Sequence, residues 1–224
     1  MCSNIVMLAI IRRCGSTMLR SILKQNKDVV VEGEIYRDYI NLRQDLRKEK
    51  YENEVFRQVN LLKKLTPDKK YLYTVTGEDI MHLHKFNLLS HIMPSKVIFL
   101  YRRNLLEHYC STEISRLTNT YIDNIESKNL KNKIHLEYNS TSVDRHVHNI
   151  KKSAYYILYF LKKYNLPYIK QEYNSILKET SNIFKFIDID NNNYLPSTIK
   201  NETRSLSSIF INYSDIKKQY LLQL

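Results

Sequence analysis

Residues 5 to 23 read IVMLAIIRRCGSTMLRSIL, and this stretch decides the expected fold. The unbroken apolar run from Ile5 to Ile11 predicts a strand that is buried on both faces of a sheet. Gly15-Ser16-Thr17 predicts a turn and a helix start, and the helix that follows has one apolar face made of Leu19, Ile22 and Leu23. A strand, a turn and a helix in this order predict a βαβ unit, which a second parallel strand would complete.

The 201 residues that follow this stretch repeat this alternation or connect its parts. Further strands are expected at residues 29–31, 71–76, 96–101 and 168–170, and helices at 36–65, 105–117, 143–164 and 175–187. The pattern predicts the α/β class, with a P-loop-like open parallel sheet flanked by helices. The length suits a single domain over residues 1–224, with possible substrate-side helical insertions at 37–70 and 118–150.

Composition limits the classes of function. The chain has 35 Lys and Arg against 23 Asp and Glu, a net charge of +12, which favours an anionic ligand or a polyanionic partner. Cys2, Cys14 and Cys110 lack the spacing of a disulfide framework or a zinc site, so no metal is expected. No apolar run is long enough to cross a bilayer, and the first residues lack the features of a secretory signal. We therefore expect a soluble, cytoplasmic protein without a membrane partner.

Ligands of open α/β sheets bind at the carboxyl ends of the strands, so the residues after each predicted strand are candidates for a site. These residues are Arg12 to Thr17, Gly33-Glu34, Gly77-Glu78 and Arg102 to Asn104. The chain has only three glycines, and all of them fall in these predicted turns. A protein so poor in glycine is expected to keep it where the backbone must turn sharply or approach a ligand.

The first of these turns resembles an anion cradle, because a glycine at a strand-to-helix junction exposes backbone N–H groups beside arginines and hydroxyls. It is not a nucleotide-triphosphate P-loop, since the first glycine and the lysine of that motif are missing. Two enzymatic interpretations remain open at this point. Cys14 and Arg20 have the C-x5-R spacing of cysteine phosphatases, whereas the other interpretation keeps the anion cradle and uses no protein nucleophile. A basic nucleic-acid-binding module is the non-enzymatic alternative, supported by the net charge and by residues 37–70.

Three motifs in order resemble the sulfotransferases that use 3′-phosphoadenosine 5′-phosphosulfate (PAPS), in particular the carbohydrate-type and bacterial branch. Residues 13–19, RCGSTML, are similar to the family's 5′-phosphosulfate loop, with Cys14 in place of the usual serine. Residues 96–104, KVIFLYRRN, with Ser111 eight residues after Arg103, are similar to the strand, arginine and serine that hold the 3′-phosphate. Gly33-Glu34 matches the end of the family's second strand.

The resemblance implies a sulfuryl transfer from PAPS to a hydroxyl or amine acceptor, a glycan or a small molecule, without a metal or a specific nucleic acid. It assigns Arg13 to the transition state and Glu34 to the general base, with Glu78 as the second choice of base. The residues that it implies for binding PAPS are Arg12, Arg13, Cys14, Gly15, Ser16, Thr17, Met18, Arg103, Ser111 and Lys200.

Several neighbouring residues are expected to play structural roles. Glu32 is expected on the other side of its strand from Glu34. Arg102 is expected to point away from the site that Arg103 serves. The seven histidines lack metal-ligand spacing and are expected to pack or to face solvent. Tyr155, Tyr156, Tyr159 and Phe160 recur at helical spacing and predict a core face.

Overall fold

The computed structural model describes residues 4–34, 44–64, 66, 68–119, 133–190, 205–216 and 220–224. Its strands form one parallel sheet in the order β2-β3-β1-β4-β5. The strands are β1 (Ile5–Ile10), β2 (Val29–Glu34), β3 (Lys70–Thr76), β4 (Lys96–Tyr101) and β5 (Tyr168–Glu172). This architecture confirms the predicted single α/β domain with a P-loop-like open sheet.

The central strand β1 explains why its sequence is apolar throughout. Ile5, Met7 and Ala9 enter the hydrophobic core on one face of the sheet, and the alternate residues enter the core on the other face. All six residues of β1 are buried. Since side chains alternate along a strand, a strand covered on both faces needs apolar residues at every position.

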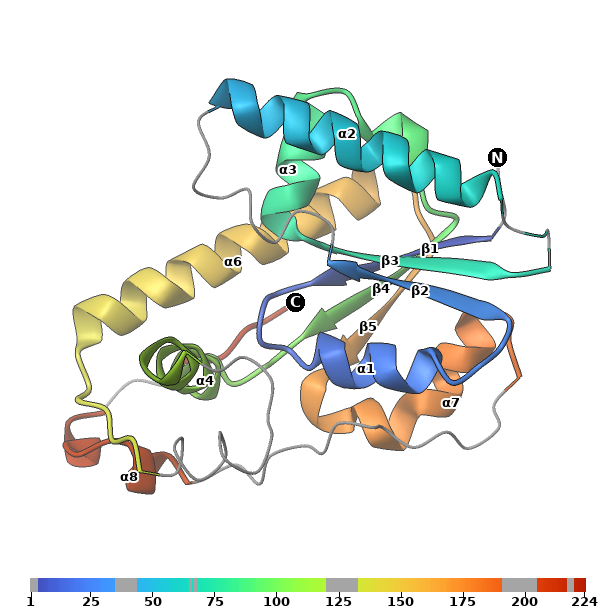
Figure 1. Ribbon diagram of the computed structural model, residues 1–224. Coiled ribbons are helices and arrows are strands. Elements are labelled where there is room, and N and C mark those ends of the chain that lie inside the picture. The colour runs from blue at the N-terminus through green and yellow to red at the C-terminus, as the bar shows by residue number, and fades with distance from the viewer. Residues whose placement is uncertain are drawn as a thin grey trace.

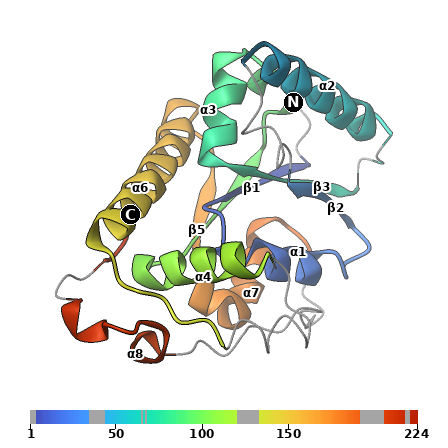
Figure 2. The same cartoon turned by 60° about the vertical axis from the view of Figure 1, so that its left-hand side comes forward.

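Helices cover both faces of the sheet (Figures 1 and 2). On one face the core includes side chains of α2 (Gln44–Leu62), α3 (Gly77–Lys85), α4 (Leu105–Thr118) and α6 (Ser140–Lys163). The other face is covered by α1 (Ser16–Leu23) and α7 (Ile176–Phe186), which lie below the sheet in Figure 1. The short helix α8 (Leu206–Ile209) lies apart from the sheet. In the part of the chain that is described, no helix is both long and apolar enough to cross a membrane.

The sequence-based prediction missed α3. Gly77-Glu78 was expected to be a turn, but Thr76 caps a helix that starts at Gly77. The Thr76 hydroxyl accepts a hydrogen bond from the Asp79 backbone N–H, and the Asp79 carboxylate accepts one from the Thr76 N–H at 2.8 Å. This reciprocal capping box satisfies two N–H groups that would otherwise lack partners. It allows the chain to turn from β3 directly into α3.

The packing of α3 on α6 requires a glycine at position 77. A Cβ atom at Gly77 would collide with the backbone of Ser153 on α6. The two helices therefore approach each other here at backbone distance. This close approach fixes where α6 crosses the carboxyl end of the sheet.

Gly77→Ala is expected to lower the free energy of unfolding by about 1–3 kcal/mol, as overpacking of a close contact does. Without the collision, alanine in a helix would stabilise by roughly 0.5–1 kcal/mol. Gly33→Ala is the matched control, because its Cβ would meet only the end of the Arg20 side chain at 3.9 Å. Urea denaturation of both variants measures the difference. Equal stability of Gly77→Ala and wild type would contradict the close approach of α3 and α6.

Residues 220–222 pair with the chain just beyond β4. The Leu105 N–H donates to the Tyr220 carbonyl and the Leu222 N–H donates to the Arg103 carbonyl, both at 2.9 Å. The Tyr220 hydroxyl lies 2.6 Å from that of Tyr138, which holds the segment on its other side. The turn that carries Arg103 is thereby tied to a segment far away in the sequence.

Candidate functional site

The loop between β1 and α1 has the backbone geometry of an anion cradle. Arg13 and Gly15 both adopt left-handed conformations, with φ of 65° and 86°. Gly15 is the N-cap residue of α1, and no side chain accepts a hydrogen bond at this cap. The first N–H groups of the helix therefore have no capping side chain, and the helix dipole favours an anion there.

Tyr173, at the end of β5, packs directly against this loop. A Cβ atom at position 15 would lie 2.5 Å from Cδ2 of the Tyr173 ring. Glycine is thus required at position 15 for space as well as for its positive φ. The contact joins the carboxyl end of β5 to the start of α1.

Arg102 lies beside the loop, contrary to the expectation that it points away. Its side chain is buried, with 5% exposed, and its guanidinium carbon lies 4.1 Å above the centre of the Tyr173 ring. Nη1 donates to the Glu107 carbonyl at 3.2 Å, whereas the buried Nε has no hydrogen-bond partner. No described carboxylate pairs with it. Arg102 is therefore a buried cation without a counterion among the residues that the structure describes.

Arg12 and Arg13 bring two more cations to the same place. Arg13 donates from Nε and Nη2 to the Ser111 hydroxyl, both at 3.3 Å, so two residues predicted to bind the nucleotide meet. Burial raises the pKa of Asp79 and the charge of Arg12 opposes this rise, which places Arg12 towards α3. Like Arg102, Arg12 has a buried Nε atom without a hydrogen-bond partner.

Two histidines link the loop to the helices that cover it. His108 on α4 bonds through Nε2 to the Arg12 carbonyl oxygen, and its Nδ1 lies 2.9 Å from Nε2 of His146 on α6. Because a carbonyl can only accept, His108 must donate from Nε2 and accept from His146. Burial, followed by the charges of His146 and Arg102, lowers the pKa of His108 to about 3. The expectation that His108 is structural fits this arrangement.

The His108 pair predicts a loss of stability in mild acid. The ordinary pKa of histidine is 6.5, so His108 binds a proton below pH 6.5 in the unfolded chain. In the folded chain it binds this proton only near pH 3. The contribution of neutral His108 to the free energy of unfolding is full above pH 6.5. It declines as the pH falls towards 3, by at most about 1.4 kcal/mol per pH unit for one proton.

Urea denaturation of wild type and His108→Gln at pH 7, 6, 5 and 4 tests this prediction. The difference between the two proteins removes the common contribution of other groups such as Asp79, whose raised pKa acts in the opposite direction. His148→Gln, at an exposed position on the same helix as His146, is the control. Parallel pH profiles for wild type and His108→Gln would show that the buried imidazole does not take up a proton on unfolding.

Cys14 is unsuited to be a phosphatase nucleophile. Its side chain is fully buried in the core beside α1, and burial raises the pKa of the thiol to about 12. The Arg102 charge lowers this pKa and the Glu34 charge raises it, but both are smaller effects. Nucleophilic cysteines are partly exposed and have lowered pKa values. The geometry thus argues against the phosphatase interpretation of Cys14 and Arg20.

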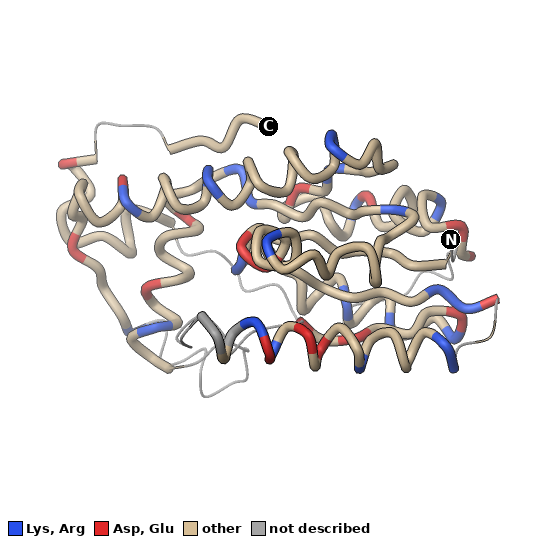
Figure 3. The backbone as a smooth tube through the Cα atoms, turned by 90° about the horizontal axis from the view of Figure 1, so that it is seen from above, with Lys and Arg blue, Asp and Glu red and all other residues tan. Residues whose placement is uncertain are grey.

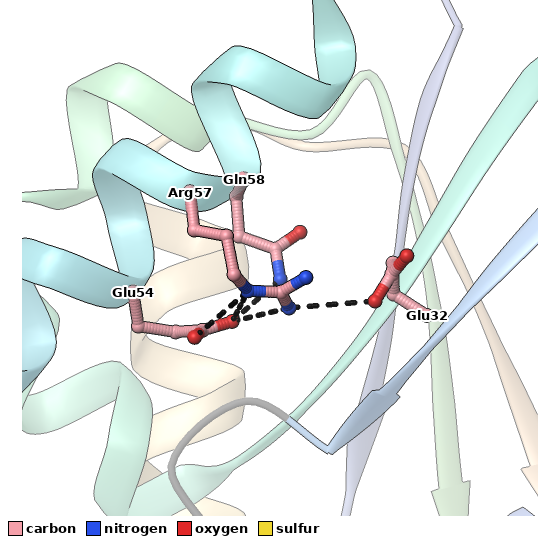
Figure 4. A network of polar contacts seen from close by, with 4 residues as sticks. All are labelled: Glu32, Glu54, Arg57 and Gln58. Carbon is pink, nitrogen blue, oxygen red and sulfur yellow. Dashed lines mark hydrogen bonds and ion pairs between the residues drawn. The ribbon is translucent and has the colours of Figure 1, made fainter.

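The two glutamates of β2 serve different surroundings. Glu32 accepts a hydrogen bond from Arg57 of α2 at 3.4 Å, and Arg57 is also bound to Glu54 (Figure 4). Glu34 lies close enough to Cys14 for its charge to affect that thiol. Residues two apart on a regular strand point to the same face, so a regular strand would not explain why Glu32 and Glu34 have different neighbours. The pairing of β2 with β3 shifts in register between Val31 and Glu34, and this irregularity accounts for the difference.

The other predicted base, Glu78, lies at the start of α3. Together with Asp79 and Tyr51 it lines a hollow of about 260 Å³. Burial raises the pKa of Asp79 to about 6, although hydrogen bonds from Thr76 and Tyr51 oppose the shift. Asp79 is committed to the helix cap, so Glu78 is the more available carboxylate of the two.

The remaining predicted residues lie around the loop or outside the described chain. Ser16 and Met18 are buried in the first turn of α1, and Thr17 is exposed there. Arg103 is exposed, and its backbone N–H lies 3.5 Å from a Glu172 carboxylate oxygen. Lys200 lies outside the described residues. The structure brings Ser111 to Arg13, whereas a contact of Ser111 with Arg103 stays a prediction.

Charge is not gathered on one basic face of α2. Lys and Arg occur on many elements in Figure 3, with Asp and Glu interspersed among them along α2. Lys48 pairs with Glu52, and Arg57 with Glu54, within this helix.

Among the residues with described positions, no three His, Cys, Asp or Glu side chains are grouped so as to hold a metal.

A solved structure with the same arrangement is the sulfotransferase domain of the olefin synthase from Synechococcus PCC 7002. It matches with a TM-score of 0.52 and 15% sequence identity, over 84% of this chain and 74% of that domain. The chain has a sulfotransferase-like fold. Thymidylate kinase from Candida albicans matches the chain with a TM-score of 0.46 and 11% identity, over 88% of this chain and 98% of the kinase. No protein-family profile and no curated protein sequence matches the chain.

Proposed function

We propose that the protein transfers a sulfuryl group from PAPS to a hydroxyl or amine acceptor. The observation that carries this proposal is Arg102, a buried cation beside the left-handed Gly15 turn with no described carboxylate partner. A buried charge without a counterion is costly, and a bound anion would remove that cost. The sulfotransferase-like fold and the three sequence motifs favour PAPS among anionic ligands.

The residues around the loop suit the 5′-phosphosulfate end of PAPS. The donors are the backbone N–H groups of residues 14–18, the hydroxyls of Ser16 and Thr17, and the unpaired Nε atoms of Arg12 and Arg102. Several fixed donors around one anion give the preorganised electrostatic stabilisation that group transfer requires. Arg103 and Ser111 are proposed for the 3′-phosphate, and Lys200 remains a further candidate.

Arg13 is proposed to offset the charge that develops on the leaving phosphate oxygen. Its guanidinium is held by Ser111 through two donors, so it is oriented before the substrate arrives. This preorientation avoids a loss of side-chain freedom during the reaction. Ser111 would therefore position Arg13 in addition to any contact with the nucleotide.

Glu34 is proposed as the general base. It would accept the proton of the acceptor while the acceptor oxygen or nitrogen forms its bond to sulfur. The bond between sulfur and the bridging oxygen breaks, and its electron pair stays on the phosphate that leaves. Glu34 suits this role because its charge reaches Cys14 in the loop, whereas Glu32 is bound by Arg57.

Nucleotide binding is the direct test of the proposal. Calorimetric titration with 3′-phosphoadenosine 5′-phosphate is expected to give a Kd on the order of 1 μM, with weaker binding of ATP and AMP. Arg102→Met keeps a long side chain that can cover Tyr173 but removes the charge, and it is expected to weaken binding at least tenfold. Binding no tighter than that of ATP would contradict the proposal.

Arg13→Ala is expected to lower kcat by about 10²–10³, the usual loss for one charge-stabilising donor. Release of 3′-phosphoadenosine 5′-phosphate from PAPS, with water as the acceptor, measures the reaction without knowledge of the natural acceptor. Arg116→Ala is the control, because Arg116 pairs with Glu113 on the exposed side of α4. Near-normal turnover by folded Arg13→Ala would refute the proposed role.

Substitution of the glutamates separates the candidate bases. Glu34→Gln is expected to lower kcat by about 10²–10⁴, the typical contribution of general base catalysis, with little change in nucleotide affinity. Glu32→Gln removes a carboxylate from the same strand and should leave kcat near the wild-type value. If Glu78→Gln abolishes turnover and Glu34→Gln does not, Glu78 is the base.

A further inference from the structure

The tyrosines of α6 form an exposed aromatic surface, contrary to the core face that their spacing predicted. Phe160 is buried, but Tyr155 and Tyr159 are 64% and 49% exposed. Their rings are stacked with centroids 6.3 Å apart, and Tyr156 meets Tyr155 edge-on at 6.1 Å. Large rings ordered against one another at an open surface are typical of a ligand-binding face.

This surface lines a hollow between α3 and α6. The hollow has a volume of about 380 Å³, within the range of small-molecule sites. It is lined by apolar and aromatic side chains of both helices together with one histidine: Ile80, Met81, His84, Tyr155, Tyr156, Tyr159, Phe160 and Tyr164. Its volume suits a small ligand with one or two rings.

A polar hollow of about 260 Å³ adjoins the aromatic one, because Met81 and Tyr156 line both. Glu78, Asn149 and Ser153 lie in the polar part and offer hydrogen-bonding groups. We call the two hollows together the α3–α6 cleft. The cleft thus has an apolar aromatic end and a polar end.

The polar end faces the same edge of the sheet as the anion loop. Ile10 of β1 is paired with Thr76 of β3. Arg12 and Glu78 each come two residues after this pair, so both lie just beyond the carboxyl ends of neighbouring strands. The charge of Arg12 also acts on Asp79, which lines the polar hollow. A ligand in the cleft would therefore direct its polar end towards Arg12 and the loop.

Cations flank the rings at the aromatic end. The Lys163 ammonium lies 5.8 Å from the Tyr159 ring centre and 5.6 Å from that of Tyr164, and it is 2.6 Å from Nε2 of His84. The Lys152 ammonium lies 6.0 Å from the Tyr156 ring. Exposed flat rings offer stacking partners to a planar aromatic ligand, and the lysine ammonium groups offer cations to its face. A sugar ring would need hydrogen-bond partners that the lining of the aromatic end offers only at tyrosine hydroxyls and His84.

We infer that the α3–α6 cleft binds the acceptor, and that this acceptor is a small planar aromatic compound with a hydroxyl group at its polar end. The inference rests on the proposed function, because it assigns the substrate that receives the sulfuryl group. It narrows the expected acceptors from glycans and small molecules in general to aromatic alcohols. Tyr155 and Tyr159 would bind the ring, and the polar hollow would hold the hydroxyl beside Glu78, the second candidate base, at the edge of the sheet that carries the loop.

A matched pair of probes tests the inference. 2-Naphthol is planar, whereas decahydro-2-naphthol has the same carbon skeleton and hydroxyl in saturated form. Calorimetric titration is expected to give at least tenfold tighter binding of 2-naphthol. The double variant Tyr155→Leu/Tyr159→Leu is expected to remove this preference, while Tyr168→Leu, at a 42% exposed tyrosine of β5 outside the cleft, should keep it.

Sulfation of 2-naphthol with PAPS then tests the acceptor role, and kcat/KM is expected to fall at least tenfold in the double variant. Equal affinity for the two naphthols, tighter binding of methyl glucoside, or sulfation unchanged in the double variant would each overturn the inference. Nucleotide titration separates the two proposals. If only the assignment of the cleft is wrong, wild type and every variant still bind 3′-phosphoadenosine 5′-phosphate. If the proposed function is wrong, wild type does not bind this nucleotide either.

Discussion

The contact of the Tyr173 ring with Gly15 and Arg102 is the interaction on which the candidate site depends. It joins the end of β5 to the β1–α1 loop and holds a cation against an aromatic face. The glycine has no side chain to separate ring and loop, and the ring leaves no space for one. The shape of the anion cradle is therefore set by a residue that lies far away in the sequence.

The carboxyl edge of the sheet carries the described residues of the proposed site. The parallel strands all end there, so Arg13, Glu34 and Arg102 lie at one edge although they come from three different strand ends. His108 and His146 then fix the Arg12 carbonyl from the helices above. A buried neutral histidine pair suits this task, because a charged one would add to the positive potential that the loop already has.

The fold could be predicted from the sequence because its main determinant is local. An apolar run such as Ile5 to Ile11 predicts a doubly covered strand by itself, and each of the five predicted strands is found within a few residues of its expected place. The start of α3 was missed although Thr76 and Asp79 carry the spacing of a capping box, a signal that a glycine between them obscured. The burial of Arg102 and the exposure of Tyr155 could not be predicted. Both depend on which distant element covers the side chain, and periodicity along one segment does not specify that element.

The pairing of residues 220–222 with residues 103–105 has a consequence for folding on the ribosome. The turn that presents Arg103 forms two of its backbone hydrogen bonds with residues that are synthesised much later. Contacts between residues so far apart in sequence form slowly, since the entropy of closing a long loop opposes them. The sheet can assemble around β1, β3 and β4 during translation, but the pairing of Arg103 must wait until the whole domain has emerged. A nascent chain would thus complete the turn at Arg103 late in folding.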